Sequence, residues 1–425
     1  MRSVILMSGL PSRGNHGGAI TCWGVTERLR KEGHDVTVVS MYDAGVGNPY
    51  LEFRDSNLAQ LHDLGVRVET IPYADREIRS GSRSRRLAGM LLGELRSYYP
   101  WAALKRSVGD ALTNIRPDAV FAYHFEALAA IDGLGLENVV GGVGDPTHLP
   151  ELYRLRMRDK RSFTGLPGST VKQVLNRWGY PRSIRRLMNQ CAVQGAFAAH
   201  HADWYARNNL RNTRYLRTPV WDPVGNGWAA LRRERQTHNH RPRVLLMGDL
   251  SGTVSKSSIE LLRKVVLPDL DQRLGPDSYE VHAIGGGIGD QVRSAFDSDN
   301  IFLRGHVEPP DDDFLAATVL LVAAPIPLGV RVRILVGFSY GCCIVAHSAN
   351  AMGIPELAHG VNALIGATGE DIAKHVASAI EDGELRSRLE RGGRETYERH
   401  FSLETAGAEV VRLMRLVSHE SQTVG

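Results

Sequence analysis

The first half of the chain alternates short apolar runs with amphipathic stretches. Residues 3–7 are apolar enough for a buried strand, and the glycine-rich loop Gly14–Gly18 follows them. Residues 19–32 then carry apolar side chains at helical spacing, and residues 36–40 predict the next strand. This strand–helix–strand order predicts a parallel sheet. Further strands of this half are expected at 66–71, 119–123, 138–142 and 213–219.

The second half begins with the same alternation. Residues 225–242 have the composition of a linker, with Gly-Asn-Gly followed by a polar run. A strand at 243–247 then leads into the loop Gly248–Gly252 and a helix at 257–266. The later elements expected are strands at 279–284, 301–303 and 319–323, a helix that begins at Asp311, a helical hairpin at 370–401 and a last helix at 403–419. Two α/β domains of similar size are therefore predicted.

Composition is that of an ordinary globular protein. Of its 425 residues, 43% are hydrophobic and 23% are charged. A chain of this length is too long for a single core. No apolar run reaches the roughly 20 residues that span a membrane, and the N-terminus fits a first strand better than a signal peptide. The four cysteines have no metal-ligand spacing, and Cys342-Cys343 is expected in the core, which fits a reducing cytoplasm.

Positive charge is unevenly distributed although the net charge is only +4. Residues 151–190 hold ten Lys and Arg against Glu151 and Asp159, and a second basic run covers 76–86. The longer segment is consistent with a peripheral membrane contact near an anionic or lipid-linked acceptor, and equally with a solvated helical face. No nucleic-acid partner is predicted, because no aromatic interleaving or recognised motif accompanies the charge.

The stretch Gly329–Gly341 is the most informative in the chain. It begins at a glycine turn and continues as a helix with Arg331 and Arg333 in its first turn, before a buried strand at Ile344-Val345. A helix start offers backbone N–H groups, and the guanidinium groups add charged donors. Together they suit the diphosphate of a nucleotide.

This stretch resembles the C-terminal half of the GT-B glycosyltransferases, in particular the retaining family with a Glu-x7-Glu motif. The matching positions are Gly329, Arg331, Arg333, Ile334, Leu335, Gly341 and Ile344-Val345. The two motif glutamates are absent, because Leu328 and Val336 occupy their positions. The resemblance implies the GT-B fold, two doubly wound Rossmann-like domains with a cleft between them.

The domain limits follow from the elements and the resemblance together. We expect an acceptor-side domain at 1–224 completed by about 403–425, a linker at 225–242, and a nucleotide-sugar-binding domain at 243–402. In the GT-B plan the last helix returns to the first domain.

In the N-terminal domain, several polar or glycine positions follow predicted strands. Gly17-Gly18 resembles the opening loop of the family, which approaches the donor, although a tight turn explains it too. His124 ends an apolar strand where the family often has a histidine that contacts the transferred sugar, and a structural histidine is the alternative. Asp145 and His148 are candidate acceptor ligands, or parts of an Asp-Pro turn.

In the C-terminal domain, the resemblance implies further donor contacts. The family's basic pair after the first strand is replaced by Asp249, with Lys256 as the nearest lysine. Glu356 and Asn362 lie in the loop that meets the sugar hydroxyls in relatives, or they shape a turn.

The predicted function is transfer of a sugar from a nucleotide diphosphate to a small-molecule, glycan or lipid-linked acceptor. The resemblance implies retention of configuration, with the leaving phosphate deprotonating the acceptor and its stabilisation supplying most of the catalysis. No cofactor or metal is expected, because no Asp-x-Asp follows a strand end. Without the glutamates, three explanations stay open: a deoxyribose donor such as a dTDP-sugar, ribose recognition from elsewhere, or lost activity. The alternatives are a non-catalytic GT-B binding protein and a GT-B epimerase or phosphorylase.

Overall fold

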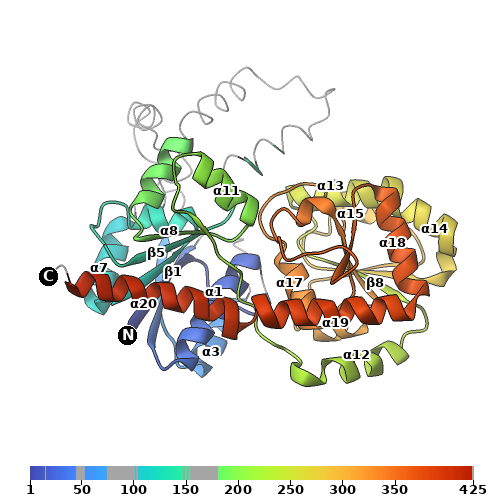
Figure 1. Cartoon of the computed structure of the whole chain (residues 1–425), viewed down its shortest axis with the longest axis horizontal. Helices are drawn as coiled ribbons and strands as arrows, with labels where there is room; N and C mark the ends of the chain where they lie inside the picture. The colour runs from blue at the N-terminus through green and yellow to red at the C-terminus, as the bar shows by residue number, and fades with distance from the viewer. Residues whose placement is uncertain are drawn as a thin grey trace, which may run out of the picture. The chain divides into compact units, whose positions relative to one another are not determined.

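The computed structural model describes residues 1–14, 16–44, 53–73, 101, 104–146, 149–150, 153 and 180–423. The chain forms two compact units, each with its own sheet and helices (Figure 1). Unit 1 comprises Met1–Pro219 and Ala406–Gly425, and unit 2 comprises Val220–Thr405.

Unit 1 is built on a seven-stranded sheet in the order β3-β2-β1-β4-β5-β6-β7, and its strand pairs are all parallel. The strands are β1 (Arg2–Ser8), β2 (Asp35–Asp43), β3 (Arg67–Tyr73), β4 (Ala119–Tyr123), β5 (Val139–Val143), β6 (Val193–Ala196) and β7 (Arg214–Tyr215). Val4 pairs with Thr37 on one side and Val120 on the other. The direction of winding therefore reverses between β1 and β4.

Helices flank this sheet, which is why β1 and β4 are apolar along nearly their whole length. The described helices are α1 (Gly17–Lys31), α3 (Arg54–Asp63), α7 (Lys105–Ile115), α8 (His124–Ala130), α11 (Ala199–Arg207) and α20 (Ala408–Thr423). The C-terminal α20 contacts α1, β4 and β5, and it buries Val410, Leu413, Met414 and Val417. The return of the last helix to the first domain is thus present in the structure.

Unit 2 repeats the plan with six parallel strands in the order β10-β9-β8-β11-β12-β13. The strands are β8 (Arg243–Met247), β9 (Glu280–Ile284), β10 (Ile301–Gly305), β11 (Val319–Val322), β12 (Ile344–His347) and β13 (Ala363–Gly366). Here the winding reverses between β8 and β11. The GT-B fold class predicted from the sequence is confirmed by these two sheets and by the comparisons given below.

The helices of unit 2 are α12 (Trp228–Thr237), α13 (Thr253–Leu261), α14 (Leu267–Leu274), α15 (Asp290–Ala295), α16 (Asp311–Ala316), α17 (Val332–Ser339), α18 (Gly369–Glu381) and α19 (Gly383–His400). Shorter turns of 3-10 helix lie at Gly225–Gly227, Pro276–Ser278 and Ser348–Asn350, and turns of π-helix at Leu262–Val266 and Leu403–Gly407. The predicted helix start at Asp311 is confirmed, with three aspartates in its first turn.

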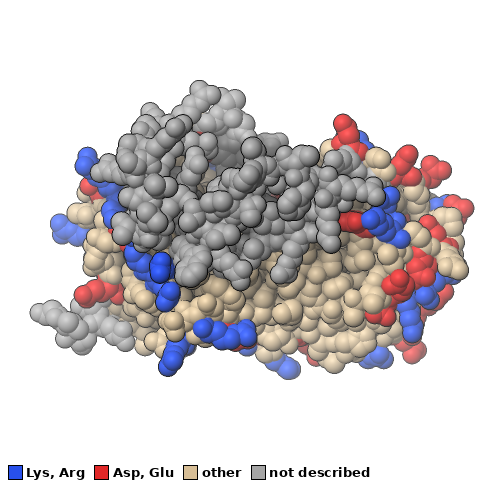
Figure 2. Space-filling model, turned by 90° about the horizontal axis from the view of Figure 1, so that it is seen from above, with Lys and Arg blue, Asp and Glu red and all other residues tan. Residues whose placement is uncertain are grey.

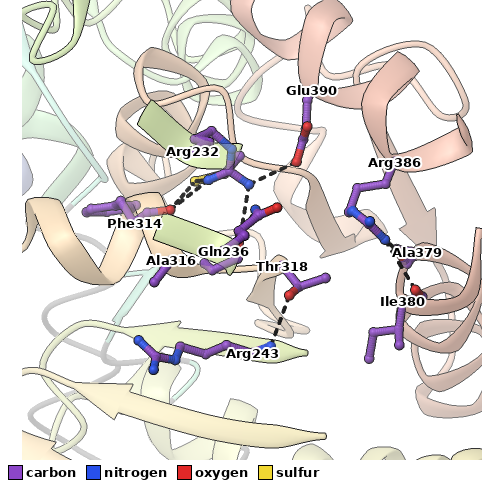
Figure 3. Close-up of polar contacts among 12 residues, drawn as sticks. Arg232, Gln236, Arg243, Phe314, Ala316, Thr318, Ala379, Ile380, Arg386 and Glu390 are labelled. Carbon is purple, nitrogen blue, oxygen red and sulfur yellow. Dashed lines mark hydrogen bonds and ion pairs between the residues drawn. The ribbon is translucent and has the colours of Figure 1, made fainter. Parts of the chain in front are cut away.

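The predicted linker at 225–242 is wrong, because most of it is helix α12 packed on unit 2. Arg232 is 2% exposed and donates hydrogen bonds to the carbonyl oxygens of Phe314 and Ala317 and to the Glu390 carboxylate (Figure 3). Gln236, one turn later, donates to the same Ala317 carbonyl. The sequence shows only that this run is polar, which is typical of a linker. Its arginine and glutamine side chains donate to carbonyl groups about eighty residues later in the chain, and the sequence does not show that these groups are close.

The division between the units falls at Pro219 and Thr405, whereas the sequence placed it at residues 224 and about 403. The reason lies in α19. Its Arg394 donates to both carboxylate oxygens of Asp222, and the hydroxyl of Tyr397 donates to the carbonyl of Val220 at 3.1 Å. The five residues before the predicted linker therefore belong to unit 2.

Acidic and basic side chains are interspersed over the visible part of unit 2 (Figure 2). The basic run at 76–86 and nearly all of 151–179 lie outside the described residues, so the predicted membrane contact stays a prediction. Among the described residues, no helix is both long enough and apolar enough to cross a membrane.

Candidate functional site

Each unit has one point where its strand order reverses, between β1 and β4 in unit 1 and between β8 and β11 in unit 2. At such a point the loops that leave two neighbouring strands turn to opposite sides, and the opening between them is where α/β sheets bind ligands. The predicted site residues fall largely on these loops and the helices that follow them.

In unit 2, Arg333 of α17 lies directly against the loop that leaves β8. Its guanidinium donates to the carbonyl oxygen of Met247. A Cβ atom at Gly248 (φ 132°) would approach three guanidinium atoms to 2.6–2.7 Å, so both space and backbone conformation require glycine there. Burial and the neighbouring Arg331 lower the pKa of Arg333 to about 10, while Asp249 opposes that shift. Arg333 is charged at neutral pH and holds the end of β8.

The loop after β8 is fixed by Asp249. Its Oδ1 accepts hydrogen bonds from the backbone N–H of Ser251 at 2.9 Å and from the Ser251 hydroxyl at 2.7 Å. The next loop packs against it, since a Cβ at Gly285 would lie 2.1 Å from the Gly248 carbonyl oxygen. Asp249, which stands where the family has an arginine, therefore forms a turn.

Arg331 is the N-cap residue of α17, so it lies at the helix end that offers free N–H groups. The structure brings Arg331 and Arg333 together, as the sequence predicted. Lys256 is exposed on α13, where it lines a groove of about 620 Å³ with Arg263, Lys264 and residues of the loops after β8 and β9. The described lining of that groove contains neither Arg331 nor Arg333.

Asn362 is fully engaged within its own loop. It is 2% exposed, its Oδ1 accepts from the N–H of Ala358 at 2.8 Å, and its Nδ2 donates to the Glu356 carbonyl at 2.8 Å and the Thr396 hydroxyl at 2.9 Å. These contacts give Asn362 a structural role in its loop, and its contact with a donor stays a prediction. Glu356 is half-buried in the same loop, and its contact with a donor stays a prediction.

In unit 1, α1 begins at Gly17, and His16 caps it by accepting from the N–H of Ala19 at 3.3 Å. A Cβ at Gly18 would meet the Tyr123 ring at 2.8 Å and His16 at 3.2 Å. Gly18 is thus required by packing, whether or not a ligand also approaches it. The surrounding protein atoms and His124 lower the pKa of His16, and water at the exposed side of this residue screens the effect of His124.

His124 follows β4 with a φ of 71°, which is unusual for a residue with a side chain and costs on the order of 1 kcal/mol. Its Nδ1 lies 3.4 Å from Oε2 of Glu126, and each side chain is 32% exposed. Burial opposes the charged form of both residues, but their mutual attraction prevails. The pKa of His124 is raised by Glu126 and Asp145, and the pKa of Glu126 is lowered by His124.

Asp145 follows β5 and lies 3.2 Å from Nδ1 of His201, measured to its Oδ1. His201 is 1% exposed, and its ring centroid is 3.9 Å from that of His200. The hydroxyl of Tyr205, also on α11, donates to the carbonyl of Gly144 at 3.0 Å. Helix α11 therefore supports the loop that carries Asp145, while His148 lies outside the described residues.

The sequence analysis did not identify His16, Glu126 or His201 as members of the group of polar side chains around His124 and Asp145. Glu126 was noticed only as separated from His124 by Phe125. His201 was missed because β6, with the short polar sequence Val-Gln-Gly-Ala, was not predicted as a strand. The adjacent pair His200-His201 was the signal that the sequence offered.

Comparison with known proteins bears out the class of fold and the C-terminal match. Residues 241–382 match the family described as glycosyl transferases group 1. The sucrose-phosphate synthase of Thermosynechococcus elongatus is similar in structure, with a TM-score of 0.68 and 12% identity over 98% of both chains. HepE of Anabaena, solved with UDP and glucose, has a TM-score of 0.64 and 13% identity over 97% of this chain and 99% of its own. WaaG, a glycosyltransferase of lipopolysaccharide biosynthesis, has a TM-score of 0.60 and 14% identity over 97% and 99%.

These likenesses establish the GT-B fold, and the match to glycosyl transferases group 1 covers residues 241–382. The resemblance to GT-B glycosyltransferases stated from Gly329–Gly341 is confirmed. A sequence search of curated proteins found no match.

Proposed function

We propose that this chain transfers a hexose-type sugar from a nucleotide diphosphate to an acceptor hydroxyl, with retention of configuration. The observation that carries the proposal is the pair Arg331 and Arg333 at the start of α17, beside the Gly248 loop and at the point where the strand order of unit 2 reverses. The complexes of HepE with UDP and with UDP-glucose give this donor class further support.

In this proposal, the residues at the start of α17 stabilise negative charge. When the bond from the anomeric carbon to the phosphate breaks, its electron pair stays on the diphosphate. Arg331 and the first N–H groups of α17 would face that charge, and the half-buried cation of Arg333 would act through the β8 loop. The acceptor proton would pass to the departing phosphate oxygen, so this route uses no paired carboxylates and no metal.

A ligand panel tests the donor class. We expect UDP, GDP, ADP or dTDP to raise the melting temperature, with dTDP at least as effective as UDP because the ribose-facing glutamate is replaced by Val336. Release of the nucleotide from the matching sugar donor, with and without EDTA, then tests transfer without metal. A strong preference for a ribonucleotide over dTDP would rule out the deoxyribose reading. The anomeric configuration of the product, read by NMR, tests retention.

Arg331→Ala tests the phosphate contact itself. Loss of a charged hydrogen bond costs about 1.5–3 kcal/mol, so nucleotide affinity measured by calorimetry should fall roughly ten- to a hundredfold. Arg331→Lys should recover part of it, since charge remains but the planar donor fork is lost. Arg391→Ala, an exposed arginine on α19, is the matched control and should bind as the wild type does. Unchanged affinity in Arg331→Ala would refute the contact.

A non-catalytic binding protein is the second candidate, and the absence of both motif glutamates favours it. It predicts tight nucleotide or sugar binding with no nucleotide release on any acceptor tested. The same panel followed by the release assay therefore separates the two functions.

A further inference from the structure

Glu126 and His124 are only two residues apart, and at that spacing two side chains of a regular helix point in different directions. The positive φ of His124 changes this, because it turns the chain between β4 and α8 and brings the two side chains to 3.4 Å. A strained residue at the carboxyl end of a strand, beside the reversal of the strand order, is a typical mark of a functional position.

We propose that Glu126 is a positioning residue that holds His124 as a charged imidazolium, whose Nε2–H donates to an oxygen of the bound sugar or acceptor. The inference rests on the proposed function and deepens it, because it assigns His124 a hydrogen-bond donor role rather than that of a base.

The geometry fixes the ring on both sides. Nδ1 of His124 is buried toward Glu126, so the accessible third of the side chain lies away from that carboxylate. On the far side, a Cβ at Gly144 would lie 2.6 Å from Nε2, which means that the ring edge occupies the space of a side chain there. The Tyr123 ring, with its centroid 5.3 Å from that of His124, borders the ring as well.

The charges around His124 favour its protonated form. Glu126 of α8 and Asp145 after β5 both raise its pKa, while burial opposes them. The pKa of His16, at the start of α1, is lowered first by desolvation and then by the charge of His124, so charging both histidines together is unfavourable. Of the two histidines, His124 is the one whose surroundings favour the protonated form.

The first experiment is an NMR titration of the His124 ring, which needs no glycosyl transfer. In the wild type His124 should titrate above the ordinary histidine value. In Glu126→Gln its pKa should fall by about one unit, a tenfold change in proton affinity, and in Glu126→Asp it should partly recover. Glu137→Gln, which removes the same charge at an exposed position of unit 1, should leave the titration unchanged. An unaltered His124 titration in Glu126→Gln overturns the proposal, whatever the activity assays show.

The second experiment is the pH profile of turnover. His124 is charged below its raised pKa and neutral above it, so wild-type turnover should decline as pH rises through that pKa. Glu126→Gln lowers the pKa of His124 and should therefore move this decline to lower pH. Gly144→Ala, whose Cβ would displace the ring, should lower turnover about tenfold while Glu126 stays in place. Melting temperatures of all variants report folding.

A shifted titration of His124 with an unshifted pH profile of turnover would show that Glu126 and His124 do not act on the ligand. A shifted titration in a protein without transfer would refute the proposed function but keep the pair.

Discussion

At the scale of single residues, the chemistry depends on contacts that one or two atoms decide. Arg333, predicted as a phosphate ligand, lies against the β8 loop and donates to a backbone carbonyl there, and its phosphate contact stays a prediction. Asn362 was predicted to contact the donor, and its side-chain amide makes hydrogen bonds to Ala358, Glu356 and Thr396. Arg331 and His124 keep the placement that their predicted roles require, at a helix start and a strand end.

His124→Ala should lower turnover far more than nucleotide affinity. His124 belongs to unit 1, whereas the predicted phosphate ligands belong to unit 2. A lost charged hydrogen bond is worth about 1.5–3 kcal/mol, so turnover should fall roughly ten- to a hundredfold. Calorimetry with the nucleotide and a turnover assay give the two numbers. Equal losses in both would place His124 at the nucleotide.

Val336→Glu should destabilise unit 2 by at least about 2 kcal/mol, because Val336 is 3% exposed and a carboxylate there would be desolvated. Thermal unfolding measures this loss, and Val330→Glu, at a half-buried position two residues before α17, is the milder control. If Val336 faces the ribose instead, the mutant should bind UDP better relative to dTDP with little change in melting temperature. The ratio and the melting temperature together distinguish the two.

At the scale of elements, polar contacts decide where helices belong. Helix α12 has the composition of a linker and is fixed to unit 2 by polar contacts, most of them made by one buried cation. Arg232 donates to the carbonyls of Phe314 and Ala317, the carboxylate of Glu390 and the sulfur of Cys342 (Figure 3). The same logic ties residues 220–222 to α19 through Arg394.

Arg232→Ala should destabilise unit 2 by about 3 kcal/mol or more, since removing one partner leaves buried carbonyls and Glu390 without their donor. Arg235→Ala, on the same helix, removes an ion pair with Asp312 whose side chains are 51% and 72% exposed. That change should cost no more than about 1 kcal/mol. Denaturant unfolding of the two variants measures the difference. Similar small losses would mean that α12 is held by its apolar contacts alone.

At the scale of the whole molecule, the chain folds as two units with separate cores, and the first is completed only by the C-terminus. Helix α20 contacts β4 and β5, and its side chains that are at most 1% exposed include the four named above, Val410, Leu413, Met414 and Val417. The two units should therefore differ in how they respond to loss of this helix.

A chain that ends at Thr405 should lose unit 1 and keep unit 2. Burying each of the four side chains contributes roughly 1.5–3 kcal/mol, so their loss removes at least about 6 kcal/mol from unit 1. Calorimetry should show one transition persisting near its original temperature, and limited proteolysis should spare residues 220–405. Preservation of both transitions would show that α20 is dispensable.

Local patterns were enough to predict the architecture, because hydrophobic periodicity and glycine turns act over a few residues. The openings at Val4 and Val244, the helix after Gly329 and the helix start at Asp311 were all predicted from such patterns. The strand β6 was not, because its four residues are held in the sheet by β5 and β7 rather than by their own propensity.

The tertiary structure alone decided two kinds of contact: those between residues far apart in the sequence, and those formed because a residue has an unusual backbone conformation. Arg232 donates to carbonyl groups more than eighty residues away in the sequence, and Asp145, after β5, lies beside His201 of α11. Glu126 faces His124 only because one φ is positive. Sequence fixes periodicity and turn chemistry locally, whereas these contacts depend on which strands become neighbours and on strain that only the packed sheet can sustain.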